Sequence, residues 1–164
     1  MTGKPAAGVT TRPAAGLAAA PGLPDYTDVA RPEWTDYNGH LSEAYYVLVF
    51  GFATDRMMEL VGLDERYRAE TGGSLYTVEA HVRYLREVRG QAALRVSTTV
   101  VSVGAKKVRF CHQMYVGDDT CVATEELQAV HVRDGHAADF PDRAAHRLRQ
   151  LVRPAPDFAG RAIS

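Results

Sequence analysis

A carboxylate and an imidazole stand four residues apart at the entrance to the most continuously apolar stretch of the chain. The octet WTDYNGHL, residues 34–41, holds Asp36 and His40 on either side of Asn38-Gly39. Acidic and imidazole groups are costly to remove from water, and glycine weakens regular structure. We expect the octet both to form a turn that few other residues tolerate and to carry out chemistry.

The chemistry follows from what surrounds Asp36. Asn38-Gly39 favours a tight turn with positive φ, and the helix predicted after it begins with unpaired N–H groups that make its end partly positive. A carboxylate beside such groups can attack a carbonyl carbon, or activate water to do so, while the N–H groups polarise the carbonyl oxygen. The alternative is structural, with Asp36 and Asn38 as caps and His40 as a single hydrogen-bond donor.

One long buried helix is predicted directly after the octet. Residues 41–62 read LSEAYYVLVFGFATDRMMELVG, in which apolar side chains surround the axis for three turns. A helix of this kind must be wrapped by other structure. Gly62 is typical of a helix end, and residues 63–73 add a short helical turn.

The remaining segments are predicted to be strands and one surface helix. A short strand covers residues 26–31, and residues 74–85 alternate between apolar even and polar odd positions, which indicates one buried face. Three further strands follow at residues 91–103, 106–116 and 120–133, separated by glycine turns, so the four long strands predict an antiparallel meander. Residues 141–153 predict a surface helix, with a loose tail after Pro154.

These elements predict an α+β fold in which a curved antiparallel sheet wraps around the long central helix. The sheet edge needs protection, so we expect dimerisation to extend the sheet. Residues 1–24, rich in Ala, Gly and Pro, are expected to form a disordered tail. The folded domain then covers residues 25–140, and residues 141–164 form a C-terminal helix and tail.

Composition excludes several classes of partner. The 164 residues suit one domain, and 19 basic against 20 acidic residues, with no basic run beyond Lys106-Lys107, disfavour nucleic acid. No apolar run reaches the roughly 18 residues of a membrane span. Six histidines have no metal-ligand spacing, and no Gly-x-Ser-x-Gly elbow occurs, so we expect neither a metal nor another cofactor.

The two cysteines indicate a reducing compartment. A three-residue loop at 117–119 would place Cys111 opposite Glu125 and Cys121 opposite Tyr115, so the two thiols would not meet. Without a disulfide or a secretory signal, the cytoplasm is the expected location.

Three segments in this order resemble a known family: WTDYNGHLSEAYY, GGSLYTVEAHVRYLREV and ATEELQAVHV. They are similar to hotdog-fold acyl-CoA thioesterases of the 4-hydroxybenzoyl-CoA thioesterase type, in which a curved sheet wraps a central helix. Within that group they look most like the thioesterases of carnitine breakdown that act on betainyl-CoA. The resemblance covers roughly residues 26–140. It implies hydrolysis of a short acyl-CoA to the free acid and CoA by a homodimer or dimer of dimers, with the site between protomers.

The resemblance also implies roles for residues of the octet and the helix start. Asp36 matches the acid that serves as nucleophile or general base, and Glu43 stands where a backbone N–H polarises the thioester carbonyl in one branch. Asn38 and His40 would shape the loop and hydrogen-bond near the acid. Plant-type relatives carry Asn where this chain has Ser42 and Glu43, so the Glu43 side chain could orient water or bind a cationic acyl group.

A betainyl group carries a quaternary ammonium, which aromatic faces and a nearby negative charge bind best. The aromatic candidates are Trp34, Tyr37, Tyr45, Tyr46 and Tyr76, and Glu43 or Glu79 would supply the charge. The alternative is that the helix aromatics, Tyr45 above all, belong to the core.

The coenzyme has weaker candidates. Lys106, Lys107 and Arg109 could contact the CoA phosphates, although a basic pair at a turn is usually solvated surface. Two other functions stay open on the residues alone. One is a hotdog hydratase or dehydratase that uses His40, and the other is a non-catalytic acyl-CoA-binding module.

Overall fold

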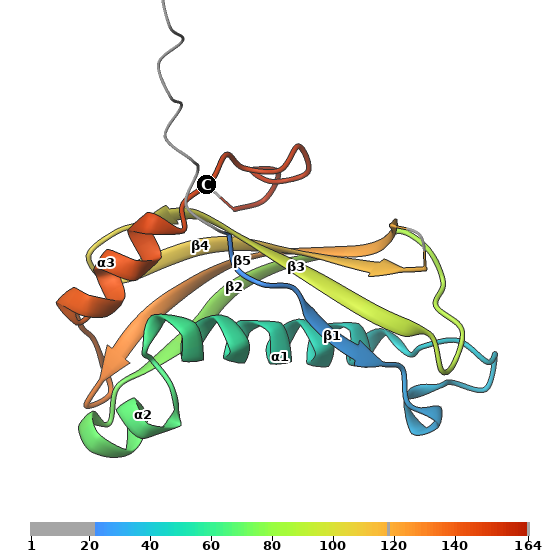
Figure 1. The fold of residues 1–164 in the computed structure, drawn as a ribbon, viewed down its shortest axis with the longest axis horizontal. Helices are drawn as coiled ribbons and strands as arrows, with labels where there is room; N and C mark the ends of the chain where they lie inside the picture. The colour runs from blue at the N-terminus through green and yellow to red at the C-terminus, as the bar shows by residue number, and fades with distance from the viewer. Residues whose placement is uncertain (1–21, 118, 164) are drawn as a thin grey trace, which may run out of the picture.

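The computed structural model describes residues 22–117 and 119–163, in which a curved antiparallel sheet lies across one long helix (Figure 1). Residues 1–21 of the predicted tail lie outside the described residues. In chain order the elements are β1 (Tyr26–Val29), the 3-10 turn η1 (Pro32–Trp34), α1 (Glu43–Val61), α2 (Glu65–Thr71), β2 (Ser74–Tyr84), β3 (Ala93–Val103), β4 (Lys107–Val116), β5 (Thr120–Arg133), β6 (His136–Ala137) and α3 (Asp142–Gln150). The predicted α+β hotdog fold is confirmed.

The helix α1 forms as its apolar pattern predicts. Its buried side chains include Tyr46, Phe50 and Met57, which pack against the sheet. Gly62 ends the helix with φ 86°, and its N–H donates to the carbonyls of Met58 and Glu59. Glycine adopts this left-handed conformation at little cost, which explains its position at the helix end.

The strand order is β1-β3-β4-β5-β2, so the predicted four-strand meander is wrong. Only β3, β4 and β5 form a meander, and β2 pairs with β5 at the far edge. The reason lies in residues 85–92, which cross from one sheet edge toward the other instead of making a tight turn. Hydrogen bonds hold this crossing segment in place, from Leu41 N–H to Val88 O (2.7 Å) and from Ala30 N–H to Ala92 O (2.9 Å).

Irregularities in the strands shift the pairing that alternation alone predicts. The β4–β5 register shifts between Met114 and Tyr115, so Cys111 lies opposite Glu126 rather than Glu125, whereas Cys121 lies opposite Tyr115 as predicted. Both thiols are free. A similar shift in β2 follows Thr77 and interrupts the predicted alternation of that strand.

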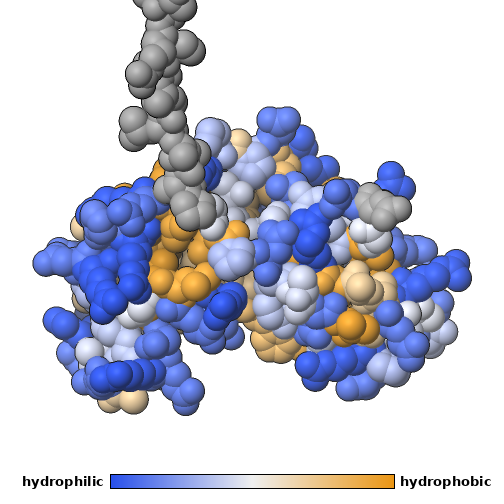
Figure 2. Space-filling view, viewed as in Figure 1, coloured by the Kyte–Doolittle hydropathy of each residue, from blue (hydrophilic) through white to orange (hydrophobic). Residues whose placement is uncertain are grey.

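The C-terminal segment is part of the packed body. Ala144, Ala145 and Leu148 of α3 are buried in one of the two core clusters. The tail after Pro154 was predicted to be loose, but Gly160 N–H donates to Glu126 Oε2 at 2.9 Å and Ile163 is only 2% exposed. Figure 2 shows an apolar patch beside α3, at a hollow lined by Leu23, Leu60 and Leu151.

Candidate active site

The octet before α1 forms the predicted tight turn. Asp36 N–H donates to His40 O at 2.8 Å, Gly39 N–H donates to Asp36 O at 3.0 Å, and Gly39 has φ 82°. A residue with a Cβ would be strained in this backbone conformation, which is the physical reason for glycine there. The turn therefore brings Asp36 and His40 together.

The Asp36 carboxylate is held by the turn that it helps to form. Its Oδ1 accepts hydrogen bonds from the backbone N–H of Asn38 (2.8 Å) and of His40 (3.2 Å), and its Oδ2 lies 3.4 Å from Asn38 Nδ2. The hydrogen bond from the His40 backbone is the largest cause that lowers the pKa of Asp36, with those from Asn38 adding to it. The carboxylate is therefore ionised and fixed in direction at neutral pH.

A pocket opens between this turn, the start of α1 and the segment after β2, and we call it the entrance pocket. It measures about 470 Å³ and is lined by Asp36, Asn38, His40, Leu41, Glu43, Tyr46, Tyr84, Leu85, Arg86 and Glu87. Ser42 N–H donates to Trp34 O at 2.9 Å, which ties the start of the helix to the turn. Within the described residues, the first-turn N–H groups of Glu43 and Ala44 have no acceptor, so the pocket has free donors at its helix end.

Four predicted site residues thus lie together in the entrance pocket: Asp36, Asn38, His40 and Glu43. Of the predicted aromatic residues, Tyr46 lines the pocket, and its hydroxyl donates to Arg86 O at 3.3 Å.

The other candidates for the aromatic cage lie outside the pocket lining. Trp34 is buried at 4% exposure and stacks on Tyr45, with ring centroids 5.5 Å apart. Tyr37 is 98% exposed on the turn, and Tyr76 and Glu79 lie on β2 outside the pocket lining. Trp34 and Tyr45 therefore have the core role that was the alternative to the aromatic cage.

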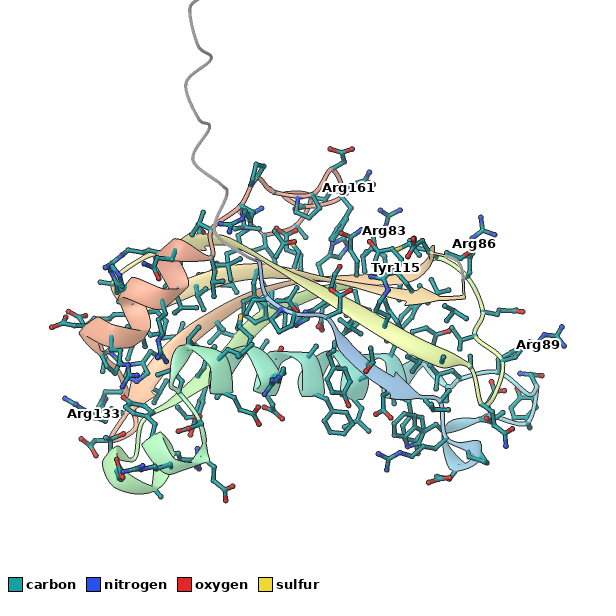
Figure 3. All side chains as sticks on the ribbon, viewed as in Figure 1. Arg83, Arg86, Arg89, Tyr115, Arg133 and Arg161 are labelled. Carbon is teal, nitrogen blue, oxygen red and sulfur yellow. The ribbon has the colours of Figure 1, made fainter. Side chains whose placement is uncertain are left out.

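Sequence reasoning missed the pocket residues that follow β2. Tyr84 meets Tyr46 edge to face with centroids 5.3 Å apart, and Glu87 Oε2 lies 3.3 Å from His40 Nε2. Arg86 lines the same pocket, and Figure 3 shows its side chain at the same end of the molecule as that of Arg89. The signal in the sequence was the mainly polar run REVR, residues 86–89, directly after the predicted strand. It was missed because Gly90 was interpreted as part of a tight turn between two paired strands.

The predicted phosphate contacts are not in the entrance pocket. Arg109 Nε donates to Glu126 Oε1 at 2.6 Å, and Lys106 Nζ lies 3.9 Å from Asp139. Lys107 is exposed at the opposite end of β4 from the pocket. Arg86 is the arginine that shares the lining of the entrance pocket with Asp36.

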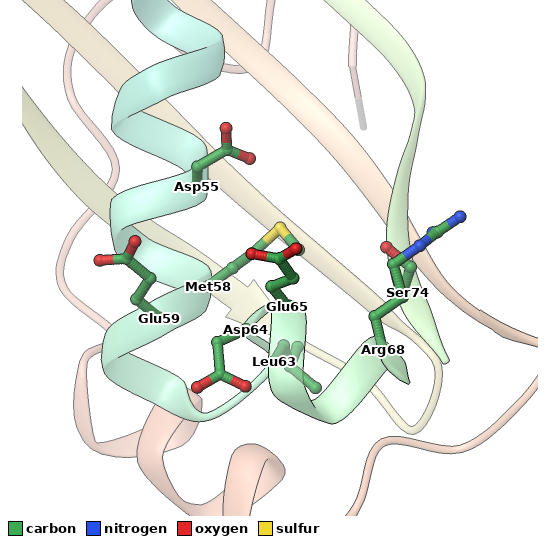
Figure 4. Close-up of a pocket in the computed structure, with 8 residues that line it drawn as sticks. All are labelled: Asp55, Met58, Glu59, Leu63, Asp64, Glu65, Arg68 and Ser74. Atoms are coloured by element: carbon green, nitrogen blue, oxygen red, sulfur yellow. The ribbon is translucent and has the colours of Figure 1, made fainter. Parts of the chain in front are cut away.

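A second hollow, of about 350 Å³, lies at the other end of α1 (Figure 4). Two of the four acids that line it have structural partners, because Glu59 pairs with Arg56 and Asp64 accepts the Tyr67 N–H at the start of α2. No group of three or more His, Cys, Asp or Glu side chains in the described part of the chain has metal-binding geometry. In the same residues, no helix is long and apolar enough to cross a membrane.

Comparison with known proteins gives a consistent result. Residues 30–148 match the family model described as the thioesterase-like superfamily. The chain is 37% identical over 149 residues to the betainyl-CoA thioesterase of Pseudomonas aeruginosa, which covers 86% of this chain and 94% of that protein. It is 39% identical over 136 residues to the L-carnitine dehydrogenase/betainyl-CoA thioesterase of Agrobacterium fabrum, covering 79% of this chain and 28% of that longer protein.

Solved structures agree with the fold. A crystal structure of a putative thioesterase from Pseudomonas putida matches with a TM-score of 0.74 and 34% identity, over 87% of this chain and 98% of that one. A Staphylococcus aureus protein in complex with CoA matches with a TM-score of 0.79 and 20% identity, over 85% of this chain and 93% of that one.

Proposed function

The chain belongs to the thioesterase-like superfamily, and we propose that within this family it hydrolyses betainyl-CoA with Asp36 as the catalytic carboxylate. It is a hotdog-fold acyl-CoA thioesterase, which cleaves a thioester to a carboxylic acid and free CoA. The relatives with matching sequence are thioesterases, so the hydratase and the non-catalytic module gain no support from them.

The observation that carries the role of Asp36 is its position in the entrance pocket. An ionised carboxylate and Glu43, whose backbone N–H in the first turn of α1 has no acceptor among the described residues, border the same space. A thioester carbonyl placed there would direct its oxygen to the N–H groups of Glu43 and Ala44 and its carbon to Asp36. Donors aimed at the developing negative charge stabilise the tetrahedral transition state.

Two routes lead from this arrangement to products. Asp36 can attack the carbonyl carbon, so that a mixed anhydride forms as the C–S bond breaks and the CoA thiolate leaves; water then hydrolyses the anhydride. Alternatively, Asp36 takes a proton from water, and the hydroxide attacks the same carbon. In both routes Asn38 and His40 keep the carboxylate in place through the hydrogen bonds described above.

The betainyl substrate is supported by the lining of the pocket as well as by the relatives. Three acids, Asp36, Glu43 and Glu87, line the pocket, and so do the rings of Tyr46 and Tyr84. A quaternary ammonium cannot donate a hydrogen bond, and it is stabilised by aromatic faces and negative charge. A neutral long acyl chain would find few apolar surfaces in the same place.

Replacement of one carboxylate tests the proposal. We expect Asp36→Asn to lower the release of free thiol from betainyl-CoA by about 100-fold or more, the usual effect of losing a catalytic acid or base. Asp55→Asn, a matched change at the far end of α1, should leave the rate unchanged. Full activity of Asp36→Asn would remove Asp36 from the mechanism.

The same proposal includes a dimer in the cytoplasm. The edge strand β2 has no neighbour on one side within the described chain, and it exposes Tyr76, Val78 and Tyr84 by 49%, 59% and 48%. Pairing of two β2 strands would cover these side chains and continue the sheet. The end of β2 also lines the entrance pocket, so the dimer would place the partner close to the site. The free thiols of Cys111 and Cys121 suit a reducing compartment.

A further inference from the structure

Glu125 is a buried acid that the proposed reaction does not use. On β5 it lies opposite His112 of β4 and opposite Val82 of β2. Residues directly opposite each other on antiparallel strands project to the same face of the sheet. Because the His112 ring stacks on Phe50 of α1, with centroids 5.6 Å apart, Glu125 also projects toward the helix. It is only 2% exposed.

The Glu125 carboxylate has no hydrogen-bond donor among the described residues. Its neighbour His112 is already committed, because Nε2 lies 2.9 Å from Thr54 Oγ1 and Nδ1 lies 3.0 Å from Thr98 Oγ1. Burial lowers the pKa of His112 to about 3, so this imidazole is neutral and supplies no positive charge. A buried carboxylate without a partner is costly, which makes its presence on an otherwise apolar face unusual.

Glu125 lies close to the entrance pocket. After burial, the charges of Glu43 and Glu125 are the causes that raise the pKa of Tyr84. Tyr84 lines the pocket together with Glu43, whereas Glu125 is buried behind the pocket lining. The Tyr84 phenol is therefore within electrostatic reach of one carboxylate at the mouth of the pocket and of a second one beneath α1.

One flank of the helix lies beside this part of the sheet. Val47, Gly51 and Thr54 share one flank of α1, because residues four and seven apart lie on the same side of a helix. Thr54 contacts His112, so this flank faces the part of the sheet where Glu125 lies. Gly51 is exposed, and a Cβ placed on it would meet no atom within 4 Å. The outer part of this flank, at Val47 and Gly51, is therefore open to solvent, while Thr54 lies against the sheet.

We propose that Glu125 is the residue that selects a positively charged acyl group, acting from behind the pocket lining on a quaternary ammonium held against Tyr46 and Tyr84. The proposal rests on the thioesterase function of the entrance pocket and adds the determinant of its substrate class. A cation held against Tyr84 supplies the counter-charge that Glu125 lacks among the described residues. Replacing the Glu125 carboxylate by a neutral group removes its attraction to a cationic acyl group. A neutral acyl group has no such attraction to lose, so its binding should be unaffected.

Two thioesters of nearly the same shape test the proposal. Betainyl-CoA and 3,3-dimethylbutyryl-CoA differ in one atom, a quaternary nitrogen in place of a quaternary carbon. We expect Glu125→Gln to lower kcat/KM for betainyl-CoA by roughly tenfold or more and to leave kcat/KM for the neutral thioester within about twofold. Glu59→Gln, a carboxylate change at the far end of α1, serves as the matched control.

The outcomes separate this proposal from the proposed function. Equal losses for both thioesters, or no loss for either, would overturn the role of Glu125 while hydrolysis by the wild type stands. A wild type that hydrolyses the neutral thioester as well as betainyl-CoA would overturn charge selection altogether. If neither thioester is cleaved, the proposed function itself fails.

A binding measurement covers the case in which Glu125→Gln does not fold. Choline and 3,3-dimethylbutanol form the same pair of cationic and neutral shapes. Choline should raise the Tm of the wild-type protein more than the neutral alcohol does, and Glu125→Asp, which keeps the charge, should retain the difference. Equal shifts from the two compounds in the wild type would contradict a cation site.

Discussion

Burial of Glu125 makes the stability of the protein depend on pH in a direction opposite to that of most acids. Burial raises the pKa of this carboxyl from 4.5 to about 7. Below pH 4.5 the group is neutral in both the folded and the unfolded chain, so it costs nothing. Between pH 4.5 and 7 the unfolded chain releases the proton first, and folding becomes less favourable. Above pH 7 both states are ionised and the full cost is present.

The magnitude follows from the two pKa values. Each pKa unit corresponds to about 1.4 kcal/mol, so the ionised Glu125 should cost about 3 kcal/mol of unfolding free energy at pH 8. Glu125→Gln has a neutral side chain at every pH. Its unfolding free energy relative to wild type should therefore rise by about 3 kcal/mol between pH 4.5 and pH 8.

The other groups that face Glu125 do not reverse this sign. His112 on β4 stays neutral because burial lowers its pKa to about 3. The pKa of Tyr84 on β2 is raised above its ordinary value of 10, so this phenol is neutral throughout the range. Glu43 on α1 is exposed and is present in both proteins, so its contribution largely cancels in the comparison.

Urea denaturation at several pH values, at one protein concentration, measures the effect. Wild type, Glu125→Gln and the exposed control Glu59→Gln would be compared. Choline at pH 8 should raise the unfolding free energy of the wild type but not that of Glu125→Gln. Parallel curves for wild type and Glu125→Gln from pH 4.5 to 8 would show that the carboxylate is solvated and would refute the reasoning.

Three further predictions follow from the same geometry. Gly51→Ala should raise the unfolding free energy by about 0.5–1 kcal/mol in thermal or urea unfolding, because a helix interior favours Ala and the exposed Gly51 position has room for a methyl group; a lower unfolding free energy would contradict this. If the wild type is the proposed dimer, Val78→Lys should convert it to monomers in light scattering, whereas Val29→Lys on the other edge strand should not; an unchanged mass would contradict pairing through β2. Because hydrogen bonds lower the pKa of Asp36, kcat/KM for the neutral thioester should be retained as pH falls and should decline only below pH 3.8, the ordinary value. A decline of kcat/KM centred near pH 6 would show that a group other than Asp36 controls the pH dependence.

The sequence predicted those features that depend on local patterns. The apolar run of α1, the stop at Gly62 and the turn at Asn38-Gly39 follow from neighbouring residues, and the structure has all three. The position of β2 could not be predicted in this way, because residues 85–92 were read from Gly90 as a short turn. Their actual course depends on hydrogen bonds to residues 30 and 41, which are far away in the sequence.

The missing pocket residues have the same origin. Tyr84 and Arg86 line the same pocket as Asp36 only because the chain crosses over after β2. Glu125 left a local signal, since it interrupts the series Ala123, Leu127 and Ala129 on the helix-facing side of β5. A charged residue at a helix-facing position of a central strand lowers the stability of the fold, because burying a charge is costly. Such a residue is therefore a candidate for a functional role.

The different surroundings of Asp36 and Glu125 bear on the choice between the two catalytic routes. N–H donors hold Asp36 ionised and lower its pKa, which weakens it as a base but leaves it available for attack at all physiological pH values. Glu125 has the more suitable pKa for a base, yet it is buried beneath α1 and away from the free N–H groups at the helix start. On these grounds we expect Asp36 to act as a nucleophile. In a single turnover in ¹⁸O-labelled water, hydrolysis of the anhydride at the Asp36 carbonyl carbon places the label in the Asp36 side chain, whereas hydrolysis at the acyl carbonyl places it in the released acid. Label in Asp36 would establish the nucleophilic route, because the general-base route labels only the released acid.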